Sequence, residues 1–325
     1  MSVMTLVKAI NNALDIELNE NENVVVYGED VGYEGGVFRV TQGLQKKYGE
    51  KRVFDSPLAE SGIVGTAVGM AVAGLKPVVE MQFSGFAYPG FNQMISHVSR
   101  MRNRSRGKYT SSLVIRMPYG GGIKALEHHS ESMEALYAHI PGLKVVIPST
   151  PHDAKGLLIS AVESEDPVIY MEPKRIYRAV KQEVSEDKFK VQIGKANVVQ
   201  QGTDVTVVSY GAMMRDTQKA LAMAKKAGIS VELIDLRTIY PLDRETIASS
   251  IKKTGRLVSV TEAPKTFGPG GELMALANEE AFLHLEAPPK RITGFDTIFP
   301  LPQGEHHYIP SPERIYYEIE RTVKF

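Results

Sequence analysis

The sequence contains no cysteine among its 325 residues. This absence excludes disulfides, iron–sulfur clusters, zinc sites with thiolate ligands and cysteine nucleophiles, and it fits a protein of a reducing cytoplasm. An excess of one charge is also missing, because 38 Lys and Arg residues balance 38 Asp and Glu residues. A net charge of zero argues against a protein that binds nucleic acid through bulk positive charge.

Long hydrophobic runs are lacking too. The longest nearly uncharged apolar stretch covers residues 62–75, which is shorter than the roughly 20 residues that a membrane helix needs. The first ten residues hold one lysine and no apolar core, so we expect no targeting signal. We therefore expect a soluble cytoplasmic protein without a membrane partner.

Strand and helix patterns alternate along the first half of the chain. Short β-branched runs predict strands, and apolar residues at helical spacing predict helices between them. The expected strands cover 24–27, 77–81, 113–117, 143–147 and 167–171, and the expected helices cover 6–18, 61–75, 91–101 and a segment from 151. This alternation implies an α/β fold with a mostly parallel sheet covered by helices on both faces.

The pattern restarts in the second half of the chain. Strands are expected at 205–209, 231–235 and 257–261, with helices at 215–227, 243–253 and 271–283. Between the halves lies a polar, irregular stretch with many charges, which is typical of a linker. We expect a first domain over 1–172, a linker over 173–190 and a smaller α/β domain over 191–325.

The usual phosphate-binding and hydrolase motifs are missing. The chain has no G-x-x-x-x-G-K-[ST] loop, no G-x-G-x-x-G after a strand, no H-E-x-x-H and no G-x-S-x-G. A glycine cluster at 120–122 follows a predicted strand, but no helix pattern begins there, so we interpret it as a flexible turn.

The first candidate for chemistry is Glu60. It lies between a predicted strand end and a helix rich in Gly and Ala, and ligands of α/β sheets bind at the carboxyl ends of strands. A carboxyl group in such apolar surroundings would have a raised pKa and could share a proton with a ligand nitrogen. The alternative is that Glu60 only complements the helix dipole. The spacing alone favours neither interpretation.

Three other segments are weaker candidates. His128 and His129 could supply a proton shuttle, although solvated loop histidines are the simpler interpretation. Phe86 could stack on a flat heterocycle, whereas core packing is favoured for Phe83. Five cations between residues 100 and 108 either bind an anion or form a solvated helix end; without interleaved aromatic residues they do not favour nucleic acid.

Several strings taken together identify a family. They are Gly28–Val31, Phe54–Ser61, His129–Ser132, Pro141–Pro148 and Met171–Arg178. In this order they closely resemble the β subunits of the thiamine-diphosphate-dependent decarboxylase component of 2-oxo acid dehydrogenase complexes. The resemblance runs from near residue 4 to the C-terminus without large insertions.

The resemblance implies a transketolase-like fold, with an N-terminal pyrimidine-binding domain and a C-terminal domain that helps to build the oligomer. In this family a G-D-G…N-N motif on the α subunit holds Mg²⁺ and the diphosphate of the cofactor. This chain has no such motif. The resemblance therefore implies half a site, completed by the α subunit in an α₂β₂ heterotetramer that also binds a lipoyl acyltransferase core, with Phe325 facing that core.

The resemblance also assigns residue roles. Glu60 would hydrogen-bond the aminopyrimidine ring of thiamine diphosphate, and Phe86 would stack on that ring. Glu29, Leu58 and Gln82 would line the same half-site. His129 would act as an acid or base and help to position the lipoyl group.

Some family members hold K⁺ with backbone carbonyl groups. The matching positions here are Ser111, Leu113, Val114, Ala161, Ser164 and Asp166. Val114 stands where relatives with threonine would add a hydroxyl ligand.

The activity that the resemblance implies is oxidative decarboxylation of a 2-oxo acid, followed by transfer of the acyl group to lipoamide. The segments 138–142 and 173–178 resemble branched-chain enzymes slightly more than pyruvate enzymes, so a branched-chain substrate is expected first and pyruvate next. One alternative is half of a split transketolase or a deoxyxylulose-phosphate-synthase-like enzyme. Another is a non-catalytic scaffold, against which the intact Glu60 argues.

Overall fold

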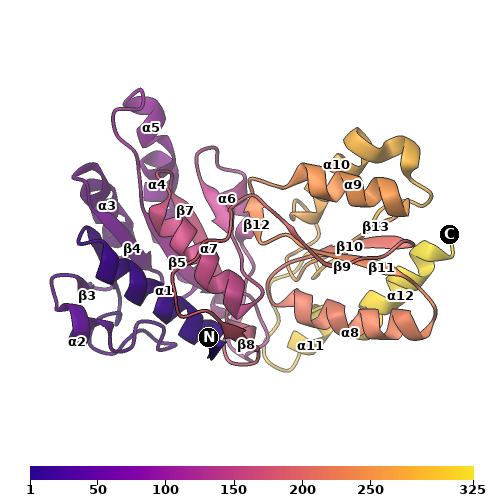
Figure 1. Ribbon diagram of the computed structural model, residues 1–325, viewed down its shortest axis with the longest axis horizontal. Coiled ribbons are helices and arrows are strands. Elements are labelled where there is room, and N and C mark those ends of the chain that lie inside the picture. The colour runs from indigo at the N-terminus through magenta and orange to yellow at the C-terminus, as the bar shows by residue number, and fades with distance from the viewer. The chain divides into compact units, whose positions relative to one another are not determined.

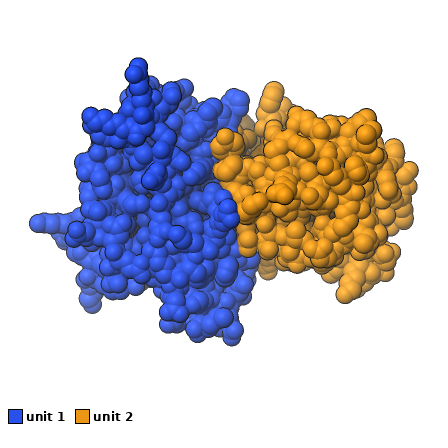
Figure 2. Space-filling model, turned by 45° about the horizontal axis from the view of Figure 1, so that its top comes forward, with its two compact units in different colours: residues 1–119, 136–193 blue, residues 120–135, 194–325 orange.

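The computed structural model describes residues 1–325 (Figure 1). The chain forms two compact units, coloured separately in Figure 2. Unit 1 contains residues 1–119 and 136–193, and unit 2 contains residues 120–135 and 194–325. None of the helices has the length and apolar character that a membrane span requires.

The core of unit 1 is a parallel sheet. Its strands are β2 (Val24–Gly28), β3 (Val53–Asp55), β4 (Lys76–Glu80), β5 (Val114–Tyr119), β6 (Lys144–Val146) and β7 (Val168–Pro173). They lie in the order β6-β7-β5-β4-β2-β3, and every neighbouring pair is parallel. All residues of β2, β5 and β7 are buried, which is expected of strands covered on both faces.

Helices cover this sheet in packed pairs. The helices of unit 1 are α1 (Leu6–Glu20), α2 (Leu44–Tyr48), α3 (Glu60–Val72), α4 (Tyr88–Ser96), α5 (Met101–Arg104) and α7 (Pro151–Glu163), and α6 (Glu134–Ala138) spans the boundary between the units. α1 packs on α7, and α3 packs on α4. α7 begins at Pro151, where a helix was expected, and the Thr150 side chain caps it.

Two expectations about unit 1 were wrong. The single helix expected at 91–101 is instead α4, a 3₁₀ turn at Val98–Arg100 and α5, because His97 leaves the helical conformation. The stretch 173–190 is not irregular: it contains a 3₁₀ turn (Lys174–Ile176) and β8 (Lys181–Val184), which pairs antiparallel with β1 (Ser2–Thr5).

A buried ammonium group stabilises the end of that stretch. The Nζ of Lys155 donates to the carbonyls of Ser185, Glu186 and Asp187 at 2.7, 2.9 and 2.8 Å. The domain boundaries at 172 and 191 stay a prediction, and the two compact units differ from them by placing residues 120–135 with unit 2.

Unit 2 has a second sheet in the order β14-β13-β10-β11-β9. Its strands are β9 (Asn197–Gln200), β10 (Val205–Ser209), β11 (Val231–Asp235), β13 (Leu257–Val260) and β14 (Lys290–Ile292). β12 (Thr238–Tyr240) follows β11 in the chain but is not a strand of this sheet. β9 is antiparallel and the other neighbouring pairs are parallel. Its helices are α8 (Met213–Lys226), α9 (Arg244–Thr254), α10 (Gly270–Ala281), α11 (Glu305–Tyr308) and α12 (Pro312–Val323).

The α/β fold expected from the sequence is therefore confirmed in both units. In unit 2 the helices α8 and α12 pack together, and Ile315 and Ile319 of α12 join the core built on β10 and β11. The C-terminal strand and helices, from residue 290 onward, were not predicted.

Candidate functional site

The carboxyl ends of three neighbouring strands form the edge at which a site was expected. Gly28 at the end of β2 pairs with Asp55 of β3 and with Glu80 of β4. The segments that follow these three strands carry Glu29, Glu60 and Gln82. The topology of unit 1 thus gathers the residues that the resemblance assigned to one half-site, as ligand-binding edges of parallel sheets require.

Glu29 and Glu60 are close enough to influence each other. Glu29 is buried, with 8% of its surface exposed, and its Oε1 atom has no hydrogen-bond partner. Burial raises the pKa of the Glu29 carboxyl, and the negative charges of Glu60 and Asp30 raise it further. A buried carboxylate oxygen without a partner costs free energy, so this atom is suited to a donor that arrives with a ligand.

Glu60 begins α3 and is the sole ionisable residue of that helix. Its position is fixed by close packing, since a Cβ on Gly90 of α4 would lie 3.1 Å from the carbonyl oxygen of Glu60. The Glu60 side chain is half-buried, while Leu58, two residues earlier, is largely exposed. The open surroundings leave the carboxylate accessible to a ligand.

Gln82 and Phe86 follow β4 on the same edge. Gln82 Nε2 donates to Asp30 Oδ2 at 2.9 Å, which joins the segment after β4 to the segment after β2. Phe86 is half-buried, and its ring meets the edge of the Phe83 ring at a centroid distance of 5.3 Å. Phe83 is buried, as expected for core packing.

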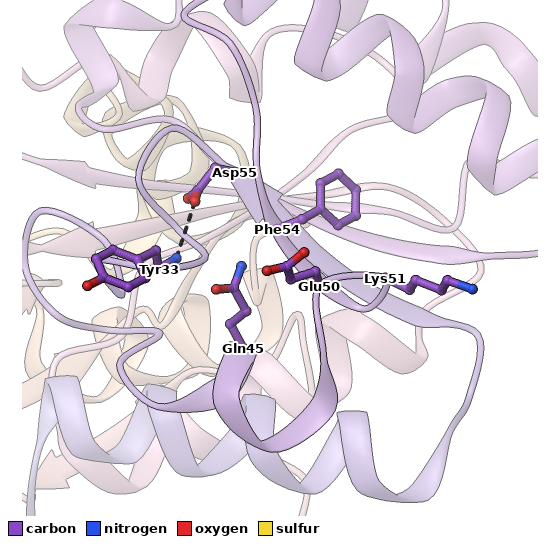
Figure 3. A pocket seen from close by; sticks show the side chains of 6 residues that line it. All are labelled: Tyr33, Gln45, Glu50, Lys51, Phe54 and Asp55. Atoms are coloured by element: carbon purple, nitrogen blue, oxygen red, sulfur yellow. Dashed lines mark hydrogen bonds between the residues drawn. The ribbon is translucent and has the colours of Figure 1, made fainter.

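Asp55 organises the loop after β2 without belonging to the predicted half-site. Its carboxylate accepts hydrogen bonds from the backbone N–H groups of Gly32 at 2.6 Å and Tyr33 at 3.2 Å. Figure 3 shows Asp55 and Tyr33 beside a shallow hollow that is also lined by Gln45, Glu50, Lys51 and Phe54. This contact holds the loop that begins with Glu29.

Sequence reasoning missed a buried network directly behind this edge. Arg116 of β5 donates to Glu80 at 2.8 Å and to both carboxylate oxygens of Glu172 at 2.7 and 3.1 Å. The Tyr177 hydroxyl donates to Glu172 at 2.5 Å. Burial raises the pKa of Glu80, while the charge of Arg116 opposes that rise. The signal in the sequence was a charged residue inside each of three apolar strand patterns.

His129 lies in a 3₁₀ turn (Glu127–His129) of unit 2. It is half-buried, whereas its neighbour His128 is exposed, so the two imidazoles have different surroundings. Ser130 is buried, and its hydroxyl contacts the Ala125 carbonyl at 3.5 Å. The His129 segment is therefore ordered rather than a free loop.

A buried carboxyl group anchors the His129 segment within unit 2. Glu134 accepts a hydrogen bond from the Tyr210 hydroxyl at 2.7 Å, and burial raises the Glu134 pKa to about 7. The backbone N–H of Lys124 donates to Glu305 at 3.1 Å. Gly120, with φ +82°, lies against the Glu262 carboxylate, where a Cβ would clash. The glycine cluster is thus a packed turn, not the flexible turn that we expected.

Several residues of the predicted potassium site already have hydrogen-bond partners within the chain. The Leu113 carbonyl accepts from Val168 N–H at 3.1 Å, and the Ser164 hydroxyl donates to the Asp166 carbonyl at 2.8 Å. The Lys144 ammonium group places a positive charge beside two of these residues, with Nζ 3.1 Å from Ser164 Oγ and 3.3 Å from Asp166 Oδ2. The potassium site stays a prediction.

Three cations of the run at 100–108 are engaged within the chain, at the end of α4 and in α5. Arg102 pairs with Glu165 and Asp166 at 3.2 and 2.8 Å. Arg104 donates to the Ser96 carbonyl at 2.5 Å, and Arg100 donates to the Ile95 carbonyl. Cations at the C-terminus of a helix complement its dipole.

Two family models match the chain. The model for the transketolase pyrimidine-binding domain matches residues 2–180, and the model for the transketolase C-terminal domain matches residues 194–315. Among solved structures, a split-gene transketolase described as an inactive β₄ tetramer superimposes with a TM-score of 0.81. It is 22% identical and 99% of each chain is covered, so it supports the fold alone.

Curated relatives are much closer in sequence. The pyruvate dehydrogenase E1 component subunit β of Acholeplasma laidlawii is 58% identical, covering 100% of this chain and 99% of the relative. The proteins of the same name from Mycoplasma pneumoniae and Staphylococcus epidermidis (strain RP62A) are 52% and 50% identical, with at least 97% of each chain covered.

These names do not support the branched-chain preference. That expectation rested on the segments 138–142 and 173–178, and the structure gives both of them packing roles. A Cβ on Gly142 would lie 2.2 Å from the Ser99 carbonyl, and Tyr177 joins the buried Arg116 network. Sequence similarity in such segments therefore reflects packing and not substrate preference. Substrate preference depends on the binding pocket, which distinguishes one methylene group by only about 1–3 kcal/mol.

Proposed function

Because the chain belongs to the family of β subunits of thiamine-diphosphate-dependent 2-oxo acid dehydrogenases, we propose that its substrate is pyruvate. In this proposal the acetyl group left after decarboxylation passes to a lipoyl group on an acyltransferase core. The names of three relatives at 50–58% identity support this choice of 2-oxo acid.

The observation that carries the proposal is the pair of carboxyl groups at the strand edge. Glu29 offers a buried oxygen without a partner, and Glu60 lies close enough to raise the Glu29 pKa. An aminopyrimidine presents ring nitrogens and an amino group, which are the hydrogen-bonding groups that two such carboxyls can bind. The residues present therefore fit the pyrimidine half of thiamine diphosphate.

Each residue of the half-site has a distinct task. Thiamine diphosphate, when bound, would supply a nucleophilic ring carbon for the 2-oxo group and a positively charged ring as the acceptor of the electrons left by CO₂. Glu60 shares a proton with a pyrimidine nitrogen. Glu29 accepts a hydrogen bond from the ligand. Phe86 packs on the ring face, while Leu58 and Gln82 line the same edge. His129 donates or accepts a proton during transfer to the lipoyl group.

The proposal includes partners. An α subunit would hold Mg²⁺ and the diphosphate, so this chain would act only in an α₂β₂ assembly. No group of three or more His, Asp or Glu side chains in the chain is arranged to hold a metal ion. The face of the C-terminal helix α12 that ends near Phe325 is the proposed side for the acyltransferase core.

The test is reconstitution with the α subunit and thiamine diphosphate. We expect kcat/KM to be higher for pyruvate than for branched-chain 2-oxo acids. Glu60→Ala should reduce decarboxylation by a factor of about 10²–10⁴, the usual contribution of a positioned acid or base. Glu22→Ala, which changes an exposed glutamate in a turn, is the matched control.

Two outcomes would contradict the proposal. Unchanged decarboxylation in Glu60→Ala would favour a scaffold, and full activity of the chain without an α subunit would remove the half-site. His129→Ala separates the steps: lipoyl acylation should fall more than decarboxylation measured with an artificial electron acceptor. Activity on sugar phosphates without lipoyl acylation would favour a transketolase half.

A further inference from the structure

Unit 1 contains a second concave site, lined by positive side chains. Its volume is about 670 Å³, and it lies where the start of α1, the segment after Phe38 and the start of β8 meet. Four of its lining residues are cations and none is an acid: Lys8, Arg39, Arg178 and Lys181. No role in the proposed reaction uses any of these residues.

The fold builds this hollow from segments far apart in the sequence. The register of β1 with β8 places Thr5 opposite Lys181, and α1 begins at the next residue. Arg178 Nη2 donates to the Phe38 carbonyl at 2.9 Å, while Asn11 Nδ2 donates to the Val40 carbonyl at 2.7 Å. These bonds hold the segment that carries Arg39 against α1.

The charges in the hollow are largely uncompensated. Lys8 and Lys181 form no ion pair with any acid of the chain. Arg39 is paired with Glu34 at 2.7 Å, but both side chains are about half exposed, and such pairs contribute little. Like charges brought together cost stability unless something else neutralises them.

The start of α1 also carries a positive charge that no acid of the chain compensates. Thr5 caps the helix by accepting from the Lys8 N–H at 3.4 Å. The first turn contains no acidic residue and has Lys8 instead, although the positive end of the helix dipole favours acids there. Lys8 is thus unfavourable for the helix itself and has no compensating contact. Such locally unfavourable residues are expected at functional positions.

We propose that this hollow binds a small phosphate ester, such as a nucleotide or a phosphorylated metabolite. Guanidinium groups match the geometry of phosphate oxygens, and the two lysines add point charges. The N-terminal N–H groups of the fifteen-residue helix α1 favour the same anion. The volume lies within the range of small-molecule sites. The concave shape favours a small ligand over an acidic protein surface.

An anion bound in this hollow would also affect the strand edge that carries Glu29. Arg39 belongs to the same loop as Glu29, and that loop is closed by bonds from Gly36 N–H to the Asp30 carbonyl at 2.7 Å and from Thr41 N–H to the Gly35 carbonyl at 3.1 Å. An anion held by Arg39 would stabilise the loop from its far end. The ligand is therefore a candidate regulator of the half-site.

The test is calorimetric titration of the full-length chain with sodium pyrophosphate as the probe. We expect saturable binding that weakens with added salt and is tighter than binding of inorganic phosphate. The double variant Lys8→Gln/Lys181→Gln should lose about tenfold to a hundredfold in affinity, since two charged contacts are removed. Neither lysine has a partner in the chain, so the fold should be retained, which thermal unfolding checks.

Two matched variants locate the bound probe. Lys46→Gln removes an exposed cation of α2 in the same unit and should change the affinity less than twofold. Glu60→Gln alters the proposed cofactor half-site and should leave pyrophosphate binding unchanged. Hydrogen exchange should slow at residues 34–42 when pyrophosphate is added to the wild-type chain and not when it is added to the double variant.

Several results would overturn the proposal. One is no pyrophosphate binding by the wild-type chain, and another is equal binding by the double variant. A changed pyrophosphate affinity in Glu60→Gln would assign the probe to the cofactor half-site. If the double variant instead weakened only the association with the α subunit, the cations would serve acidic side chains of that protein. All of these readouts are independent of decarboxylation, so they stand whether or not the proposed function is correct.

Discussion

Glu134 is a carboxyl group that the fold has removed from water. Burial raises its pKa to about 7 from an ordinary value of 4.5, against the opposing hydrogen bond from Tyr210 and with a smaller contribution from the charge of Glu262. The folded state thus binds this proton more tightly than the unfolded chain does. The stability that it contributes is complete below pH 4.5 and is lost as the pH rises through about 7.

This predicts a pH-dependent effect of Glu134→Gln, which keeps the shape without the charge. Between pH 5 and pH 8 the variant should gain about 2.5 kcal/mol in unfolding free energy relative to the wild type, because the wild type must ionise a buried group. Chemical denaturation of both proteins at the two pH values measures the difference. A difference that does not change with pH would show that Glu134 is already ionised at pH 5.

Arg116 is the centre of a network that holds β4, β5 and β7 together behind the proposed half-site. Arg116→Met would leave Glu80 and Glu172 buried without their counter-charge and should cost about 3–5 kcal/mol of unfolding free energy. The exposed Arg215→Met in α8 is the control and should cost less than about 0.5 kcal/mol.

A triple variant distinguishes charge from packing at the same place. Adding Glu80→Gln and Glu172→Gln to Arg116→Met removes the uncompensated charges and should recover part of the lost stability. Denaturant titration of the single and triple variants checks this. Equal losses in both would mean that the cost arises from the packing of the Arg116 side chain instead.

At the residue scale, the sequence could predict individual side chains but not the contacts between them. Glu60 could be singled out because it is the lone carboxylate before an apolar helix, and the resemblance added the other members of the half-site. The bonds from Arg116 to Glu172 and from Tyr210 to Glu134 join residues 56 and 76 positions apart. No local pattern carries that information, so both networks were missed.

At the element scale, two helix glycines should respond oppositely to alanine. A Cβ on Gly69 of α3 would have no neighbour within 4 Å, whereas a Cβ on Gly156 of α7 would lie 2.5 Å from Val191 Cγ2 and 3.0 Å from its backbone nitrogen. Alanine is favoured over glycine in a helix interior by about 1 kcal/mol. Gly69→Ala should therefore stabilise the chain by about 0.5–1 kcal/mol.

Gly156→Ala should instead destabilise the chain by about 1–3 kcal/mol, because the added methyl group overpacks the contact with Val191. Thermal unfolding of the two variants side by side checks both signs. Equal stabilisation of both would mean that the segment around Val191 moves away from α7 at little cost.

A helix or strand was predictable where the local residue pattern alone identifies it. β-branched runs predicted β2, β4, β5, β6 and β7, because strands buried on both faces are apolar throughout. β8 was missed since three of its four residues are exposed and charged or polar, and its pairing with β1 depends on residues at the opposite end of unit 1. The break at His97 was missed because apolar spacing continues through it.

At the scale of the whole molecule, the chain does not divide at a single point. Residues 120–135 lie between two parts of unit 1 in sequence but pack within unit 2, through Gly121 against Phe299, Lys124 N–H to Glu305 and Glu134 to Tyr210. A domain boundary drawn from composition alone cannot detect this exchange, because it depends on which side chains meet after folding.

This arrangement predicts the behaviour of a fragment that covers residues 1–193. The fragment contains all of the strands β2 to β7, so hydrogen exchange at β2, β4, β5 and β7 should remain slow. Residues 120–135 lose Phe299, Glu305 and Tyr210, and their amides should exchange at rates close to those of an unfolded peptide. Adding the fragment 194–325 should restore protection there, because it returns the partners of Glu134 and Lys124. Protection of 120–135 in the first fragment alone would mean that unit 1 holds the His129 segment by itself, and the assignment of that segment to unit 2 would then be wrong.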